Sequence, residues 1–283
     1  MWTKKCFDNL LLLVVLLLLP GCNGADNSVV TVLHTSDTHS RIEPERSGLG
    51  GLAGRAALIE SVRDSVGADN LLLLDCGDFS QGSLYYNVYK GAYEVDAMNL
   101  LGYDAAAIGN HEFDFGLGNL ALLLKRAHFP FLCANLDFAG TPCEGLVRPY
   151  AVVEKCGKRI GLFGLSPNPE GLVLKEHCRG VVYRSPVEAA QRCADELRKK
   201  GCSLVICLSH LGFDAPWGCG DEQLAAATEG IDIILGGHSH DYFDVPVVRK
   251  NSLGKDVLIN HSGKYGRAVG LLSVGSDERQ NYK

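Results

Sequence analysis

The sequence lacks several features that would point to particular classes of protein. No C-x-x-C pair occurs among its 11 cysteines, so neither a cysteine-ligated zinc site nor a thioredoxin-like redox centre is indicated. Basic runs are also missing, and the chain carries a net charge of −6. Because binding to a phosphate backbone needs a basic patch, we do not expect a nucleic-acid polymer as a partner. Repeats, low-complexity stretches and linkers are absent after residue 28, which favours one domain over residues 29–283.

Only one apolar run stands at the N-terminus, and it is short. Residues 10–19 are uninterrupted Leu and Val, and Lys4 and Lys5 precede them. A membrane-spanning helix needs about 20 apolar residues, so this layout predicts a secretory signal peptide over residues 1–21.

The end of that segment resembles a known processing site. Leu19-Pro20-Gly21-Cys22 is similar to the lipobox of bacterial lipoproteins, with Pro20 where a small residue is more usual. The resemblance implies a lipid-modified Cys22, followed by a polar spacer over residues 22–28. We therefore expect export to the periplasm or cell surface and a lipid anchor in a bacterial membrane.

The sequence does not indicate which of the remaining cysteines form disulfides. Loss of Cys6 and acylation of Cys22 would leave nine of the 11, an odd number that requires at least one free thiol. Cys76, Cys133 and Cys207 lie in or beside apolar, strand-like runs and are predicted to be small core residues.

From residue 29 onward, apolar runs alternate with helical patterns. The predicted strands cover residues 29–34, 71–74, 105–108, 131–135, 150–154, 159–165, 204–208, 231–235, 245–248, 256–260 and 268–274. Three helices are predicted. One ends near residue 66, and the other two cover residues 93–101 and 186–200. Strands 150–154 and 159–165 are close enough in sequence to form an antiparallel hairpin. This order predicts a sheet-based α/β sandwich.

One loop carries the densest set of chemical groups. Residues 109–114, Gly-Asn-His-Glu-Phe-Asp, follow the predicted strand 105–108, at the strand end where open α/β sheets place their ligands. Asn110 offers an amide oxygen and His111 an imidazole, and Asp114 can orient that imidazole. Alone, the six residues could be a polar turn.

Four other predicted strands also end in loops with metal-binding types of side chain. Their candidate ligands are Asp37 and His39, Asp78, His210, and His238 and His240. Taken singly, a histidine such as His210 is more often a residue at a strand end whose hydrogen bonds are satisfied, and an aspartate such as Asp78 more often forms a turn. Five such loops at the same kind of position favour a shared metal centre instead.

The donor set indicates which metals to expect. A mixture of carboxylate, imidazole and amide oxygen suits Mn²⁺, Zn²⁺ or Fe²⁺. Seven ligands, Asn110 included, exceed one tetrahedral site but fit two ions that share one carboxylate. Two ions roughly 3.5–4 Å apart can hold a bridging hydroxide and clamp a phosphoryl group for in-line displacement.

In order, the five loops read Asp-x-His, Gly-Asp-x-x-x-Gly, Gly-Asn-His-Glu, Ser-His and Gly-His-x-His. This series resembles the calcineurin-like metallophosphoesterases over residues 29–275. The longer forms Gly-Asn-His-Glu-Phe-Asp and Gly-Gly-His-Ser-His are similar to the bacterial 5′-nucleotidase and UDP-sugar hydrolase branch. The resemblance implies a four-layer α/β/β/α fold.

The resemblance also implies a role for each residue. One metal would be bound by Asp37, His39 and His240, and the other by Asn110, His210 and His238. Asp78 would bridge the two ions. His111, oriented by Asp114, would stabilise the transition state or protonate the leaving oxygen.

We therefore expect an exported two-metal phosphomonoesterase that acts on nucleotides. Relatives of this branch also hydrolyse cyclic nucleotides, UDP-sugars or a sulfur ester, and a non-catalytic metal-binding lipoprotein subunit is the alternative from another class. The branch normally adds a C-terminal domain that recognises the nucleoside. Since this sequence ends at Lys283, we expect a separately encoded domain as a partner.

Overall fold

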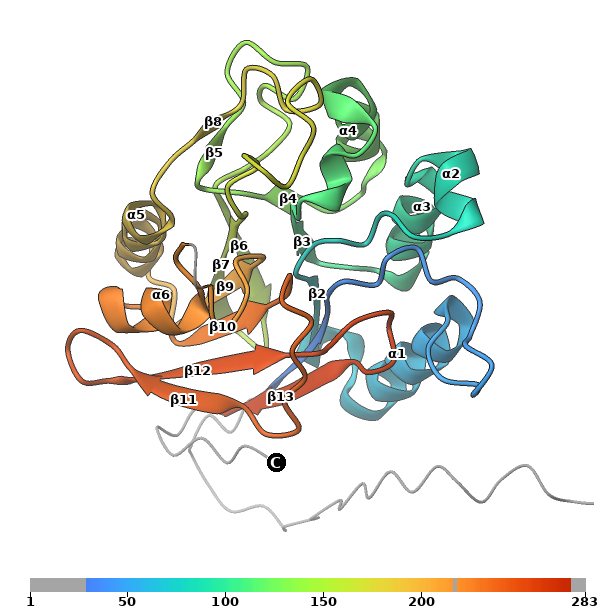
Figure 1. The fold of residues 1–283 in the computed structure, drawn as a ribbon. Coiled ribbons are helices and arrows are strands. Elements are labelled where there is room, and N and C mark those ends of the chain that lie inside the picture. Colours follow the sequence, from blue (N-terminus) through green and yellow to red (C-terminus); the bar gives the residue numbers. More distant parts are fainter. Residues whose placement is uncertain (1–28, 216–217, 276–283) are drawn as a thin grey trace, which may run out of the picture.

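The computed structural model describes residues 29–215 and 218–275. The predictions for the signal peptide, for Cys22 and for the spacer therefore lie outside the described residues. Two sheets lie face to face, with helices on the outer side of each (Figure 1).

The first sheet has the strand order β13-β1-β2-β3-β4. Its strands are β1 (Val30–Thr35), β2 (Leu71–Asp75), β3 (Ala105–Ala107), β4 (Phe131–Leu132) and β13 (Gly270–Val274). The first four run parallel, and β13 pairs antiparallel to β1 at the edge.

The second sheet has the strand order β11-β12-β10-β9-β7-β6. Its strands are β6 (Tyr150–Lys155), β7 (Lys158–Leu165), β9 (Leu204–Ser209), β10 (Ile233–Gly236), β11 (Val247–Lys250) and β12 (Asp256–His261). The central four are parallel, and β6 and β11 are antiparallel edge strands. A small pair, β5 (Leu136–Asp137) and β8 (Val182–Tyr183), stands apart from both sheets.

The helices cover the two outer faces. They are α1 (Leu52–Val66), α2 (Leu84–Tyr89), α3 (Ala92–Leu101), α4 (Gly116–Arg126), α5 (Pro186–Lys199) and α6 (Asp221–Ala227), with short 3₁₀ turns η1 (Ala68–Asn70) and η2 (His111–Phe113). Apolar residues of α1, α3 and α4 pack on the first sheet, and those of α5 and α6 on the second. No helix among the described residues is long and apolar enough to cross a bilayer.

Strand β2 shows why the sequence builds four layers. Leu71 and Leu73 belong to the core between the first sheet and its helices, whereas Leu72 and Leu74 belong to the core between the two sheets. Successive strand residues point to opposite faces, so a continuous run of leucine is buried on both sides. The predicted four-layer α/β/β/α fold is confirmed, as is the antiparallel hairpin of β6 and β7.

The largest correction to the predicted strands falls on residues 131–135, of which only Phe131 and Leu132 are in β4. The N–H of Cys133 donates to the carbonyl of Arg148, and that of Ala134 donates to the carbonyl of Gly164 in β7. The chain therefore leaves the first sheet at this point and turns toward the second. Cys76, Cys133 and Cys207 are buried as predicted, and the nine cysteines among the described residues are all free thiols.

Candidate metal centre

The loops that leave β1 and β2 are joined by backbone hydrogen bonds beyond the ends of the strands. The N–H of Asp37 donates to the carbonyl of Gly77 at 2.9 Å, and that of His39 donates to the carbonyl of Asp78 at 3.0 Å. From the second sheet, the N–H of His238 donates to both carboxylate oxygens of Asp37 at 3.1 Å. These bonds fix the candidate ligands before any ion binds.

Five candidate ligands have a left-handed backbone. Their φ angles are 49° at Asp37, 45° at His39, 54° at Asp78, 72° at His238 and 61° at His240. Residues other than glycine seldom adopt such angles, which cost on the order of 1–3 kcal/mol each when the surroundings impose them. Strain of this kind concentrates at functional sites, so its presence in five residues of one centre supports a functional role.

Two motif glycines make room for the carboxylates. A Cβ atom on Gly109 would lie 2.2 Å from Oδ1 of Asp78, and one on Gly237 would lie 2.8 Å from Oδ2 of Asp37. Any larger residue at either position would displace a candidate ligand. The glycines of Gly-Asn-His-Glu and Gly-Gly-His-Ser-His therefore serve close packing at the centre.

The first group of donors comprises Asp37, His39 and His240, whose donor atoms lie within 4.8 Å of one another. The Nε2 atoms of His39 and His240 are 3.1 Å apart, and Nε2 of His240 is 3.5 Å from Oδ1 of Asp37. Asp37 and His39 are buried, whereas the His240 side chain is 31% exposed. The opening toward solvent thus lies on the His240 side of this group.

The second group comprises Asp78, His210 and His238, again with donor atoms within 4.8 Å. Nε2 of His210 is 3.0 Å from Oδ2 of Asp78. A third group of the same size links Asp78 to His39 and His111. Asp78 is therefore shared by two of the groups and adjoins the first through His39.

Electrostatics make the Asp78–His210 pair the most strongly perturbed part of the centre. Burial raises the pKa of Asp78, but His210 outweighs burial and holds that pKa well below its ordinary value. Burial lowers the pKa of His210, but Asp78 outweighs burial and raises it to about 10. With no ion bound, the pair therefore carries one proton on His210.

The surrounding groups respond mainly to burial. Burial raises the pKa of Asp37 to about 6 and lowers the pKa values of His39 and His238 to about 4. Burial also lowers the pKa of His240, and the ammonium of Lys264 lowers it further. Neutral imidazoles are the form that binds metals, so these histidines are held ready for coordination.

Two buried polar atoms test whether the residues fit a metal. Neither Oδ1 of Asn110 nor Nε2 of His210 has a hydrogen-bond partner, although the latter is close to Asp78. Nδ1 of His210 donates to the carbonyl of Cys76 at 2.7 Å, so in the neutral ring Nε2 presents a lone pair toward the carboxylate. With no ion bound, the proton on His210 fills this place; a divalent ion would replace that proton and would also give Oδ1 of Asn110 a partner. The residues fit a divalent ion.

The predicted dyad lies beside these groups. Nδ1 of His111 and Oδ2 of Asp114 are 2.9 Å apart, and both side chains are about 30% exposed. Burial lowers the pKa of His111, but Asp114 and Asp78 outweigh it and raise the net value. The structure thus gathers seven of the predicted residues in these groups and pairs Asp114 with His111, whereas Asn110 stands next to His111 in the chain with a buried Oδ1 that has no partner.

The sequence analysis missed Glu112, whose side chain has no contact with solvent. Its carboxylate is fully buried and accepts the N–H groups of Gly109 at 2.7 Å, Asp78 at 3.0 Å and Ser80 at 3.2 Å. It joins the loops after β2 and β3. The motif contains this glutamate, but two of its three partners, Asp78 and Ser80, lie more than 30 residues away.

Lys264 and Tyr265 were also missed. Nζ of Lys264 is 3.2 Å from Nδ1 of His240, and the Tyr265 ring lies against that of His39, with centroids 5.7 Å apart. Arg41 lies over the Tyr265 ring at 4.5 Å. This side of the centre is therefore cationic. Lys264 and Tyr265 come from the loop between β12 and β13, which has no recognisable pattern, and Arg41 comes from the loop after β1.

Comparison with known proteins agrees with this geometry. Residues 30–242 match the family model described as calcineurin-like phosphoesterase. The chain is a calcineurin-like phosphoesterase. The predicted family resemblance is thus confirmed.

The chain is 34% identical to a snake venom 5′-nucleotidase of Gloydius brevicauda over 91% of its own length and 47% of that protein. A 5′-nucleotidase precursor from Thermus thermophilus matches with a TM-score of 0.79 and 40% identity, over 88% of this chain and 52% of that one. An NAD nucleotidase of Haemophilus influenzae matches with a TM-score of 0.79 and 25% identity, over 89% and 54%. The chain spans about half the length of the curated relatives it matches.

The first prediction concerns Glu112→Gln. The amide would keep one acceptor oxygen but turn an NH₂ group toward at least one backbone donor. We expect the free energy of unfolding of the metal-free protein to fall by about 1–3 kcal/mol, the cost of an unsatisfied buried group. Urea denaturation measures this change in the free energy of unfolding. Exposed Glu176→Gln is the control, and equal stability of both variants would remove Glu112 from its positioning role.

Proposed function

We propose that this chain is a metal-dependent hydrolase of phosphate monoesters and that its substrates are nucleoside monophosphates. The observation that carries the proposal is the pair of three-donor groups, one of them containing Asp78, with the His111–Asp114 pair beside them. The similarity to proteins named 5′-nucleotidases supports the nucleotide as substrate.

The ligand assignment follows the two groups. Asp37, His39 and His240 would hold one ion, and Asn110, His210 and His238 the other, with Asp78 between them. Mn²⁺, Zn²⁺ and Fe²⁺ are all compatible with this donor set. When bound, such ions stabilise negative charge on a phosphoryl group and activate water for in-line attack.

The chain's own residues supply positioning and a proton. Asp114 accepts a hydrogen bond from Nδ1 of His111, which fixes the ring and leaves Nε2 directed at the groups around Asp78. Although burial lowers the pKa of His111, Asp114 and Asp78 raise the net pKa and so favour the protonated ring. His111 can then donate a hydrogen bond, or its proton, to the leaving oxygen.

The proposal is tested with the purified chain loaded with Mn²⁺ or Zn²⁺. We expect release of phosphate from AMP and from p-nitrophenyl phosphate, and loss of both activities with a chelator. If the chain hydrolysed only UDP-sugars, cyclic nucleotides or sulfur esters, it would have another activity of the family instead of the proposed one. Metal binding without hydrolysis of any ester would identify a non-catalytic metal-binding protein.

Export, lipidation of Cys22 and a separately encoded nucleoside-binding domain stay predictions. The N-terminal sequence supports the first two, and it lies outside the described residues. Kinetics on this chain alone test the third. A preference for AMP over p-nitrophenyl phosphate of more than about a hundredfold, roughly 2.7 kcal/mol, would make such a partner unnecessary.

We predict that Asp78→Asn costs more activity than loss of any ligand that serves one group only. Removal of the shared charge weakens both groups at once. Metal content by mass spectrometry and kcat on p-nitrophenyl phosphate measure the effect, with exposed Asp64→Asn as the control. Two ions per chain and near-normal kcat in Asp78→Asn would refute the bridging assignment.

For His111→Ala, we predict that metal content survives while kcat falls by about two to four powers of ten. The decrease should be smaller for esters with good leaving groups, because they need less help from a proton donor. Exposed His128→Ala provides the matched control. Loss of one metal equivalent in His111→Ala would instead place His111 among the ligands.

A further inference from the structure

A lysine on the loop between β12 and β13 contacts one of the candidate ligands. The ammonium of Lys264 lies 3.2 Å from Nδ1 of His240 and 5.0 Å from the centre of the Tyr265 ring. Lys264 is half-buried, and no carboxylate within residues 29–215 and 218–275 forms an ion pair with it. Because a charge that is partly removed from water needs a counter-charge, this ammonium is available to an anion from outside the chain.

The contact with Lys264 fixes the position of the proton on the His240 ring. An ammonium group only donates hydrogen bonds, so Nδ1 of His240 accepts one and, in the neutral ring, Nε2 carries the proton. Contacts of His39 lead to the same assignment. Nδ1 of His39 lies 3.3 Å from the carbonyl oxygen of Ser80, which only accepts, so Nε2 of His39 has the free lone pair. Nε2 of His240 therefore donates to Nε2 of His39 at 3.1 Å.

Although the His240 ring is neutral, this tautomer opposes metal binding. The group of Asp37, His39 and His240 would bind its ion through Nε2 of His240, which lies 3.5 Å from Oδ1 of Asp37. An imidazole that binds a metal presents a lone pair to the ion and donates its other N–H to an acceptor. Here the group next to the other nitrogen is itself a donor. Coordination by His240 thus requires the ring proton on Nδ1 and the ammonium elsewhere.

The side chain of Lys264 is the part that can move. Its backbone is held on both sides, because the N–H of Gly263 donates to the carbonyl of Asp241 at 2.8 Å and that of Tyr265 donates to the carbonyl of Asp37 at 2.7 Å. The His240 side chain is 31% exposed, so water can accept its Nδ1–H once the ammonium has left. The exchange therefore needs the rotation of one lysine side chain and no change of fold.

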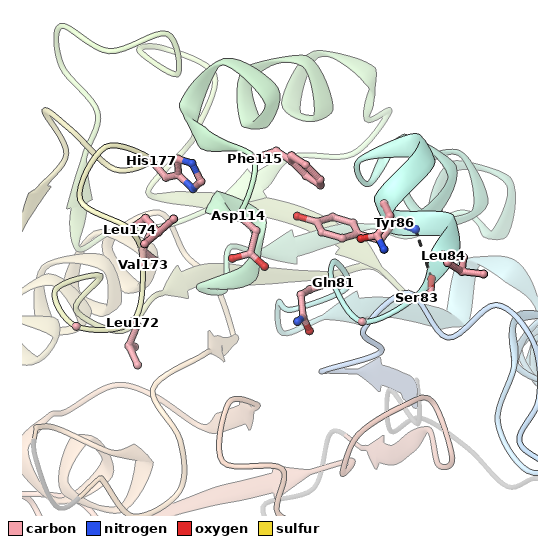
Figure 2. A pocket seen from close by; sticks show the side chains of 13 residues that line it. Gln81, Ser83, Leu84, Tyr86, Asp114, Phe115, Leu172, Val173, Leu174 and His177 are labelled. Atoms are coloured by element: carbon pink, nitrogen blue, oxygen red, sulfur yellow. Dashed lines mark hydrogen bonds between the residues drawn. The ribbon is translucent and has the colours of Figure 1, made fainter.

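The charges around the centre indicate which ligand the displaced ammonium would meet. The guanidinium of Arg41 lies 4.5 Å from the centre of the Tyr265 ring, and its Nε atom is buried without a hydrogen-bond partner. The surroundings of Asp114 differ. A pocket of about 810 Å³ opens there (Figure 2), and none of the described residues that line it is a lysine or arginine. Phosphoryl oxygens therefore find their cations on the side of Lys264.

We propose that Lys264 exchanges one partner for another when the centre takes up its ions. Before an ion binds, the ammonium holds Nδ1 of His240. Once His240 coordinates through Nε2, its ring proton stands on Nδ1, and the ammonium binds a phosphoryl oxygen of the ester. No other bond is made or broken. The second half of this inference rests on the proposed function, which it deepens by naming a residue that holds the phosphoryl group.

Lys264→Met tests the exchange, because it removes the ammonium and keeps a side chain of similar shape. In calorimetric titrations, we expect one equivalent of Mn²⁺ to bind the variant about tenfold more tightly than wild type, since one charge-assisted hydrogen bond no longer has to be broken. We expect inorganic phosphate to bind the Mn²⁺-loaded variant about tenfold more weakly, since one charge-assisted contact is lost.

Lys90→Met is the matched control. The Lys90 ammonium lies over the Phe115 ring at 5.2 Å, much as that of Lys264 lies over Tyr265, but no hydrogen bond joins it to a candidate ligand among the described residues. We expect this variant to bind both Mn²⁺ and phosphate as wild type does.

The opposite signs of the two effects identify the exchange, because a lysine that only supported the fold would weaken both ligands when it is removed. Unchanged or weaker Mn²⁺ binding by Lys264→Met, or unchanged phosphate binding, overturns the proposal. Neither titration depends on catalysis. The expected pattern in a chain that hydrolyses no ester would therefore support the exchange and defeat only the proposed function.

NMR of the histidine ring nitrogens in wild type decides the matter if Lys264→Met does not fold. We expect the His240 ring, assigned with the His240→Gln variant, to carry its proton on Nε2 in the metal-free protein and on Nδ1 after addition of Zn²⁺. Any other pair of tautomers would overturn the proposal.

Discussion

A buried carboxylate surrounded by imidazoles, that of Asp78, is the constraint on which this structure depends. The Asp78 side chain is 3% exposed and lies 3.0 Å from Nε2 of His210, and its Oδ1 accepts the N–H of His111 at 2.9 Å. A carboxylate this deep in a protein needs positive charge or several donors nearby. The strand ends of both sheets deliver those groups, so the four-layer arrangement can be understood as the means of surrounding Asp78.

The left-handed backbone of the candidate ligands costs conformational free energy, and the packing and hydrogen bonds around the centre offset this cost. The left-handed backbone at Asp37, His39 and Asp78 is maintained by hydrogen bonds between loops and by Glu112 below them. The leucines of β2, buried on both faces, anchor the strand from which Asp78 emerges. A second buried carboxylate, Asp221, accepts hydrogen bonds from Ser209 next to His210 and from His261. The ligands thus stand on rigid elements rather than on free loops.

The sequence predicted the strands of the two large sheets and the candidate ligands because both follow a local rule: a run of apolar residues ends, and a polar donor comes next. It missed the short strands β5 and β8. It gave no sign of the role of Glu112, because Asp78 and Ser80, two of its three partners, are distant in sequence, or of Lys264, which comes from an irregular loop. Helix α4 also escaped prediction, since Gly116 and Gly118 weaken its first turn, although Leu117, Leu120 and Leu124 form a buried face. The four layers themselves were expected only from the family resemblance.

The charges around the centre are unevenly distributed, and none of the sequence motifs indicates this distribution. Lys264 and Arg41 lie on the side of His240 and Tyr265, whereas Asp114 lies against His111. The negative charge of a phosphate ester bound at the centre would be attracted toward these cations and repelled by the Asp114 carboxylate. The reverse orientation would place like charges together in a partly buried site, where repulsion is weakly screened. An ester placed with its charge toward the cations would leave the side of His111, the proposed proton donor, for its leaving oxygen.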